Sequence, residues 1–175
     1  MANNESTNGQ ATGLKRHTIS LYVSNKPGVL IRISLVFARR GFNIDSLVVS
    51  AAHDPAFSRM VIVATGEEKT FDQILKQLAK LVDVIDARDA TKEEVVQREL
   101  ALVKIRATSE TRAEVLQVAN AFKSDVVDIG KNTITIMTTG KSAKMDSINS
   151  VFDKYGVIEV VRSGKLLIGR GDTVI

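Results

Sequence analysis

The sequence has no cysteine, no tryptophan and only two prolines in 175 residues. Without cysteine, the chain has no disulfides, no thiolate metal ligands and no cysteine nucleophile. No apolar run approaches the roughly 18 residues that span a bilayer, so we expect no membrane partner. The remaining composition, 44% hydrophobic and 25% charged, is that of a globular protein able to form one large or two small domains.

Charges of one sign are not concentrated in any part of the chain. Lys and Arg number 24 against 20 acids, and no block of five like charges occurs, which favours a mixed solvated surface. Arg40-Gly41-Phe42 resembles the stacking strand of an RNA-recognition domain, but that strand needs further aromatic residues at alternate positions. Ile44 and Ser46 stand there instead. We therefore predict no nucleic-acid partner.

The N-terminal segment is rich in Asn, Ser, Thr and Gly. Residues 1–13 contain one acid and no base, unlike a secretion signal or an Arg-rich transit peptide. We expect residues 1–15 to form a disordered tail and the protein to be cytoplasmic.

Apolar spacing predicts two similar halves. In residues 16–90 we expect strands at 17–23, 43–51, 57–65 and 81–87, with helices at 29–40 and around 71–81. This β-α-β-β-α-β order is typical of ferredoxin-like folds. The same pattern recurs in residues 99–175, with strands at 100–106, 125–129, 133–138, 157–161 and 166–168 and helices at 111–122 and 141–155. Residues 91–98 are charged, and a possible capping box at Thr91 and Glu94 predicts a short helical connector.

The turn after the first strand combines features suited to an anion. Pro27 and Gly28 precede the first helix, so the amides of residues 28–30 and the helix dipole favour a carboxylate. If the strand beginning at Asn43 lies beside the first strand, Asn25 and Asn43 meet at one end of the sheet. Their side-chain amides then suit the ammonium and carboxylate of an amino acid. The alternative is that these residues form ordinary turns.

The first helix is apolar on two sides. One stripe comprises Leu30, Ile33 and Phe37, and a second comprises Ile31, Leu35 and Ala38. One stripe covers its own sheet, so the second predicts a self-association surface. The alternative is that the second half of the chain covers it.

Catalytic and metal sites are not indicated. His17 and His53 stand at a strand start and in a turn, and we expect both to be surface residues rather than general bases. No His, Asp and Glu cluster has metal-ligand spacing. The acids Asp83, Asp86 and Asp89 fall on a predicted strand and are expected to face solvent.

Residues 164–171 lack the Lys-Ser/Thr ending of a phosphate loop, so we expect a hairpin turn at Gly164 and a flexible exit at 169–171.

Several blocks together resemble the ACT domain of the small, regulatory subunit of acetohydroxyacid (acetolactate) synthase. They begin with Asn25-Lys26-Pro27-Gly28-Val29-Leu30 and the run Phe37-Ala38-Arg39-Arg40-Gly41-Phe42-Asn43-Ile44-Asp45-Ser46-Leu47. The others lie at residues 54–55, 58–60, 76–78, 80–84, 98–105, 162–164 and 170–172, so the resemblance extends from about residue 16 onward. It implies an α+β chain in which a ferredoxin-like ACT domain is followed by a second ferredoxin-like domain.

The resemblance also implies a function. Proteins of this family are not catalysts; they bind a large thiamine-diphosphate-dependent subunit, raise its activity and make it sensitive to an end product, usually valine. Thiamine diphosphate, magnesium and FAD belong to that catalytic subunit, and no cofactor is expected in this chain. The effector, valine or else leucine or isoleucine, lies between two ACT domains paired as a homodimer.

The effector site that the resemblance implies has six members. They are Asn25, Gly28, Val29, Leu30, Asn43 and Ile44. The backbone amides of the helix start meet the carboxylate, the two Asn side chains hold the polar end, and Ile44 lines the side-chain pocket. Two other classes of function remain open, a stand-alone amino-acid-sensing module and a small enzyme acting on 2-oxoacids.

Overall fold

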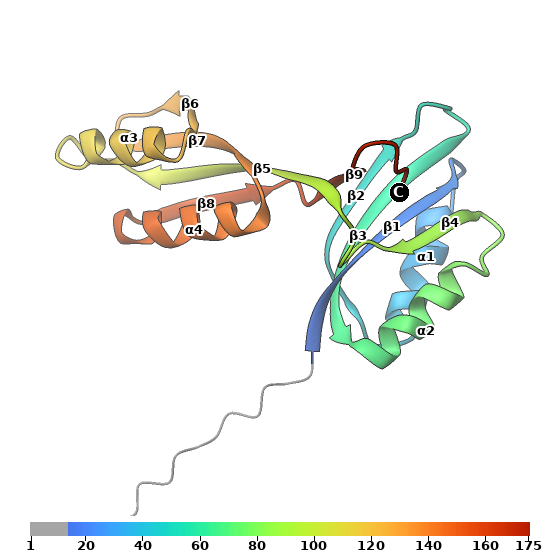
Figure 1. The fold of residues 1–175 in the computed structure, drawn as a ribbon. Coiled ribbons are helices and arrows are strands. Elements are labelled where there is room, and N and C mark those ends of the chain that lie inside the picture. The colour runs from blue at the N-terminus through green and yellow to red at the C-terminus, as the bar shows by residue number, and fades with distance from the viewer. Residues whose placement is uncertain (1–13) are drawn as a thin grey trace, which may run out of the picture.

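The computed structural model describes residues 14–175, which form two α+β modules in succession (Figure 1). Most of the predicted tail lies outside the described residues, but its last two residues, Leu14 and Lys15, already belong to the first strand. The ferredoxin-like order predicted for both halves is confirmed. None of the helices between residues 14 and 175 is long and apolar enough to cross a membrane.

The first module contains a four-stranded sheet with two helices on one face (Figure 1). Its elements are β1 (Leu14–Ser24), α1 (Val29–Ala38), β2 (Asn43–Ala51), β3 (Phe57–Glu67), α2 (Glu68–Leu78) and β4 (Val84–Asp89). The strands are ordered β2-β3-β1-β4 and all neighbours are antiparallel. β2 and β4 are therefore the two edges.

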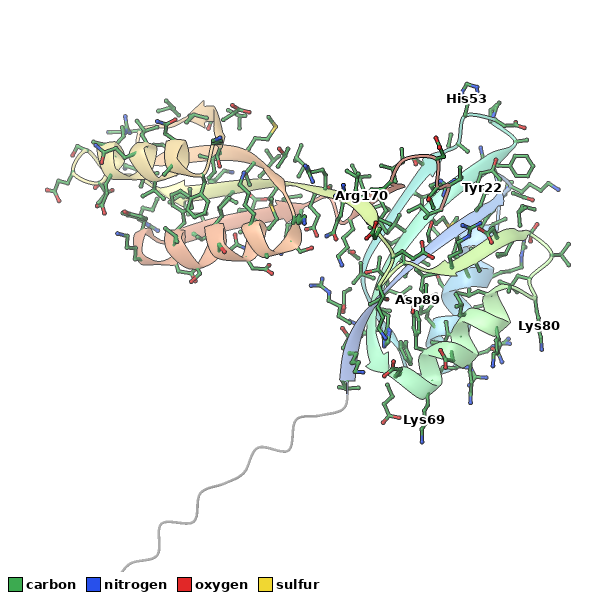
Figure 2. The ribbon with its side chains drawn as sticks, in the orientation of Figure 1. Tyr22, His53, Lys69, Lys80, Asp89 and Arg170 are labelled. Carbon is green, nitrogen blue, oxygen red and sulfur yellow. The ribbon has the colours of Figure 1, made fainter. Side chains whose placement is uncertain are left out.

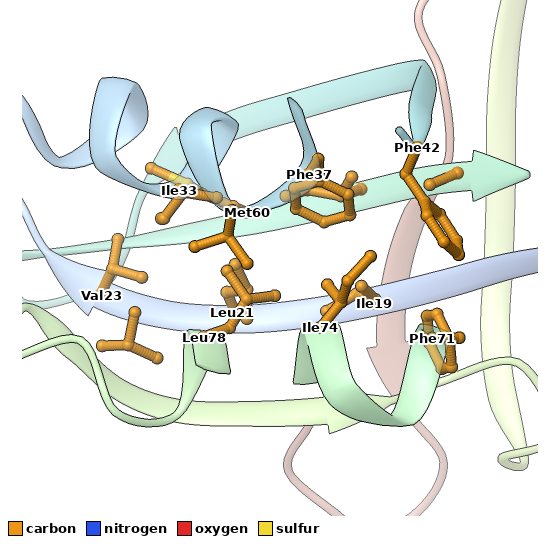
Figure 3. Packing of buried hydrophobic residues seen from close by; sticks show 14 of the residues in the cluster. Ile19, Leu21, Val23, Ile33, Phe37, Phe42, Met60, Phe71, Ile74 and Leu78 are labelled. Carbon is orange, nitrogen blue, oxygen red and sulfur yellow. The ribbon is translucent and has the colours of Figure 1, made fainter. Parts of the chain in front are cut away.

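Alternate side chains of the strands build the core of the first module. Ile19, Leu21 and Val23 project from β1 toward the helices, because successive strand residues point to opposite faces. They pack against Ile33 and Phe37 of α1, as well as Phe71, Ile74 and Leu78 of α2 (Figure 3). The spacing of these helical residues places them on one face of each helix.

The second module repeats this design with its own core. Its elements are β5 (Val95–Arg106), α3 (Arg112–Ala121), β6 (Asp125–Ile129), β7 (Thr133–Gly140), α4 (Ser142–Phe152), a 3₁₀ turn (Asp153–Tyr155) and β8 (Val157–Arg162). The strand order is β6-β7-β5-β8. Val103 and Ile105 of β5 pack with Val115 of α3 and with Ile148 and Phe152 of α4.

Two predictions about the junction between the modules are wrong. Residues 91–98 do not form a helix, because β5 begins at Val95 and its first four residues pair with β9 (Leu166–Gly169). Gly164 does not turn a hairpin either. β8 and β9 pair with successive parts of β5 rather than with each other, so residues 163–165 only carry the chain from one pairing to the next.

The segment after β9 runs back across the helix-free face of the first sheet (Figure 1). We call this face the outer face. Arg88 of β4 donates a hydrogen bond to the carbonyl of Val174 at 2.6 Å, and Ile175 is only 5% exposed. Lys165 donates to the hydroxyl of Thr18 on β1 at 3.1 Å. The first sheet is thus covered on both faces.

Candidate functional site

The N-terminus of α1 is left open for a ligand. Gly28 precedes the helix in the left-handed region, with φ of 84°, and no side chain caps the helix. The first turn carries no acidic residue. Val29 N–H makes a long bond of 3.4 Å to the carbonyl of Lys26. Within residues 14–175, no protein acceptor engages the amides of Gly28 and Leu30. These amides and the helix dipole favour an anion.

Asn25 is held in place by the loop between β2 and β3. Its backbone amide donates to the carbonyl of Ala56 at 2.8 Å, and its side-chain nitrogen donates to the carbonyl of Pro55 at 3.0 Å. The side chain is exposed. The bond to Pro55 fixes the orientation of the side-chain amide and leaves its Oδ1 to a ligand, and this oxygen can only accept a hydrogen bond. It therefore suits an ammonium group.

Asn43 lies at the other end of the sheet from Asn25, which corrects the prediction that they share one end. β3 inserts between β1 and β2, and Asn43 pairs with Thr65, which in turn pairs with Arg16 near the start of β1. Asn25 follows the end of the same strand. Nine residues of extended chain separate Arg16 from Asn25, which is about 30 Å. One chain therefore does not bring both side chains to one ligand.

The surroundings of Asn43 form a shallow hollow at that end of the sheet. Its volume is about 670 Å³, and its lining includes Leu14, Phe42, Asn43 and Thr65. Asn43 itself is exposed, whereas Ile44 is half-buried and packs against the core of the first module. Ile44 is thus far from Asn25 within one chain, and its side chain supports the fold.

A charged pair beside the helix start was not found from the sequence. Arg32, one turn into α1, binds Asp83 with its Nη2 atom 2.5 Å from the carboxylate. Asp83 lies in the turn before β4 and not on the strand that the sequence predicted. Arg32 also lies close to Gly28, since a Cβ at that position would stand 3.2 Å from Nη1 of Arg32. Because 51 residues separate Arg32 from Asp83, no local spacing in the sequence signalled this pair.

The second stripe of α1 is uncovered, as the self-association hypothesis requires. Ile31 is 66% exposed, Leu35 45% and Leu30 40%, whereas Ile33, Val36 and Phe37 are buried. Leu30 therefore belongs with the exposed stripe, and Val36 takes its predicted place in the core. The second module does not cover this stripe. We call Leu30, Ile31 and Leu35 the α1 stripe.

The two histidines differ in their surroundings. His53 is exposed in the β2–β3 loop, as predicted. His17 is not a surface residue: it is 4% exposed and stacks on Phe71 with ring centroids 3.9 Å apart. Its position in β1 has the same parity as Ile19 and Leu21, which could have revealed its burial. Among residues 14–175, no three His, Asp or Glu side chains gather as metal ligands.

Comparison with known proteins identifies relatives over most of the chain. Residues 19–86 match the model of the AHAS small subunit-like ACT domain, and residues 98–171 match that of the small subunit of acetolactate synthase. The acetolactate synthase small subunit of Mycolicibacterium smegmatis is 42% identical over 92% of this chain and 95% of its own length. The probable acetolactate synthase small subunit of Methanothermobacter thermautotrophicus is 41% identical over 89% and 93%.

A solved structure supports the same relationship. The crystal structure of the acetolactate synthase small subunit from Thermotoga maritima superimposes with a TM-score of 0.78. It is 35% identical in sequence, and the match covers 91% of this chain and 99% of that one.

Proposed function

Because the chain belongs to the acetolactate synthase small-subunit family, it is a non-catalytic regulatory subunit, and we propose that it confers feedback regulation by a branched-chain amino acid. The proposed target of this regulation is a thiamine-diphosphate-dependent catalytic subunit. In this role it raises the activity of the catalytic subunit in the cytoplasm. Valine is the expected effector, with leucine and isoleucine as the other candidates.

The separation of Asn25 and Asn43 carries the proposal about the effector site. Each chain presents two incomplete halves at opposite ends of the sheet, namely the loop at Asn25 to Leu30 and the hollow at Asn43. A small amino acid cannot span about 30 Å. A second copy of the chain must therefore supply the missing half.

An antiparallel pairing of two β2 edges satisfies this requirement. β2 is an edge strand with unpaired backbone groups along one side, which are a template for another strand. A twofold axis across this edge places Asn43 of one copy near Ala51 of the other. Ala51 leads into the β2–β3 loop that holds Asn25. The same axis brings the two α1 stripes together, so one operation buries the apolar surface and completes two sites.

The chemistry of the completed site fits a zwitterion with a small apolar side chain. The amides of Gly28 and Leu30 donate to the carboxylate, and Oδ1 of Asn25 accepts from the ammonium. Asn43 of the second copy adds a further polar contact, and the α1 stripe supplies apolar surface. A ligand that binds only the paired form favours that form, and this preference couples the site to the catalytic subunit.

Calorimetric titration with valine, leucine and isoleucine tests the site. Asn25→Ala and Asn43→Ala should each weaken binding roughly ten- to hundredfold, because a charge-assisted hydrogen bond contributes about 1.5–3 kcal/mol. Asn120→Ala, on the exposed surface of α3, is the matched control and should bind as the unaltered protein does. In the reconstituted holoenzyme, Asn43→Ala should still activate the catalytic subunit yet lose inhibition by valine.

Mixing Asn25→Ala with Asn43→Ala distinguishes a site shared by two chains from a site within one chain. In a mixed dimer, the Asn25 of one chain and the Asn43 of the other are both intact, so one site per dimer should regain the original affinity. A site within one chain predicts no recovery, and that result would refute the paired arrangement. Valine sensitivity that is unchanged in Asn43→Ala would refute the assignment of this residue.

A further inference from the structure

The two modules meet close to Arg170, which follows β9 (Figure 2). Residues 163–165, between β8 and β9, hold the modules together there, and we call these three residues the linker. The linker is fixed to the second module through Ser163, whose amide donates to the carbonyl of Leu100 at 2.9 Å. The hydroxyl of Ser163 in turn accepts from the amide of Leu100 at 3.0 Å. Because Leu100 belongs to β5, an inner strand of the second sheet, the linker moves with that sheet.

The linker also contacts the outer face of the first sheet. Lys165 donates to the hydroxyl of Thr18 on β1 at 3.1 Å, and Gly164 lies against β2. A Cβ at Gly164 would stand 2.9 Å from Cγ2 of Val48 and 3.4 Å from Cβ of Ser46. Both of these β2 side chains lie on the outer face, because the residue between them packs against the core. The linker therefore joins the edge strand β2 to the second module.

The contact between the linker and β2 requires a glycine. Gly164 has a φ of 84°, in the left-handed region that a side chain disfavours. In addition, a separation of 2.9 Å from the methyl carbon of Val48 is well below the roughly 3.5–4.0 Å of an ordinary carbon–carbon contact. Val48 does not readily turn away, because a β-branched side chain has few rotamers. A side chain at position 164 would therefore force the linker and β2 apart.

We infer that the contact of Gly164 with β2 transmits the effector signal from the first module to the second. The inference rests on the proposed function, in which valine favours the pairing of two β2 edges. Pairing fixes the position of β2, and the linker passes this position on to β5. The other connection between the modules bonds to β1: Ala90 donates to the carbonyl of Thr18, and the hydroxyl of Thr91 accepts from the Thr18 amide. It therefore follows an inner strand of the first sheet rather than the edge that pairs.

Inhibition of the reconstituted holoenzyme by valine tests the inference with a matched pair of variants. Gly164→Ala presses on β2, whereas Gly171→Ala adds the same methyl group at a φ of 57° with no atom within 4 Å. Gly164→Ala should lose about half or more of the maximal inhibition, and Gly171→Ala should lose none. Calorimetry should show that both isolated subunits bind valine as tightly as the unaltered chain does, because neither glycine belongs to the effector site.

Two further variants assign the effect to this contact. Ser46→Leu presses on Gly164 from the side of β2 and should also reduce inhibition, so it decides the question even if Gly164→Ala fails to fold. Val48→Ala removes the methyl group that a Cβ at position 164 would strike. Inhibition should therefore recover when Gly164→Ala is combined with Val48→Ala.

Three results would overturn the inference. They are full valine inhibition in both Gly164→Ala and Ser46→Leu, an equal loss of inhibition in Gly171→Ala, and a double variant that does not recover. A different result, the absence of valine binding to the unaltered chain, would overturn the proposed function on which the inference rests.

Discussion

The two modules share one strand order but differ at the turn between their first strand and first helix. Before α1, Gly28 leaves the helix start without a cap or an acid. Before α3, the amide of Thr108 donates to the hydroxyl of Thr111, and Glu114 in the first turn binds Lys154 at 2.9 Å. Neither helix has a side-chain cap, but α3 carries an acid in its first turn and α1 does not, so the start of α1 is the more favourable of the two for an anion.

The modules differ also in what covers their sheets. On the outer face of the first sheet, Val61 and Val63 are at most 5% exposed beneath the returning C-terminal segment. On the corresponding face of the second sheet, Leu102 and Val161 are 38% and 54% exposed. Because each module nevertheless has its own core, each should be stable in its own right, and this expectation can be tested by damaging one core at a time.

The largest effect is expected from truncating a buried phenylalanine. Phe152 and Phe37 are 0% and 1% exposed in the cores of the second and first modules. Replacing either with Ala should lower the free energy of unfolding of its own module by about 3–5 kcal/mol. The chain contains only two tyrosines and no tryptophan, with Tyr22 in the first module and Tyr155 in the second. In a Tyr22→Phe background the remaining tyrosine fluorescence comes from Tyr155 and reports unfolding of the second module in denaturant. In a Tyr155→Phe background it comes from Tyr22 and reports unfolding of the first module.

The outcome decides whether the modules are independent. Phe152→Ala should shift the transition seen by Tyr155 and leave that seen by Tyr22 in place, and Phe37→Ala should do the reverse. If either substitution shifts both transitions equally, the two modules unfold as one unit and the comparison of two separate cores fails.

The next effect concerns the open helix start. Gly28→Asp introduces a side chain at a φ of 84° and places a carboxylate where the effector carboxylate is proposed to bind. Valine affinity should fall by at least about a hundredfold, as measured by calorimetry. Ser109→Asp, in the matching turn of the second module, should leave valine binding unchanged. Equal losses in both variants would show that the turn before α1 has no special role.

The elements were largely predictable from the sequence because local patterns determine them. The strand at residues 43–51 has the predicted bounds, and the start of α1 at Val29 follows from Pro27 and Gly28. Pairings between distant segments were not predictable. The capping signal at Thr91 was overridden because residues 95–98 pair with β9, some 70 residues later.

The candidate site was predictable only in part, for the same reason. The residues of the helix start are consecutive, so their geometry is local. Whether Asn43 joins Asn25 depends on the order of strands, and the insertion of β3 between β1 and β2 separates them.

The smallest effect distinguishes two ion pairs, one from each module. In the second module, Glu99 is only 4% exposed and binds Arg162 at 2.6 Å. Burial opposes ionisation of Glu99, but hydrogen bonds from Ser142 and Arg162 outweigh it and lower the pKa of this carboxyl. In the first module, the hydrogen bond and charge of Lys15 lower the pKa of Glu68, whose side chain is half-exposed. Both pairs are therefore linked to pH, but only one is shielded from solvent.

The two pairs should respond alike to acid and differently to salt. A lowered pKa in the folded state means that each carboxylate stabilises its module above its ordinary pKa of 4.5, and that this contribution is lost as the pH falls through the folded value. Below pH 4.5 the stability of the second module should therefore fall less steeply in Glu99→Gln than in the unaltered chain. In about 1 M salt the slope due to Glu68 should vanish, because exposed charges are screened, while that due to Glu99 persists. Identical acid slopes in Glu99→Gln and the unaltered chain would show that the buried pair does not stabilise the second module.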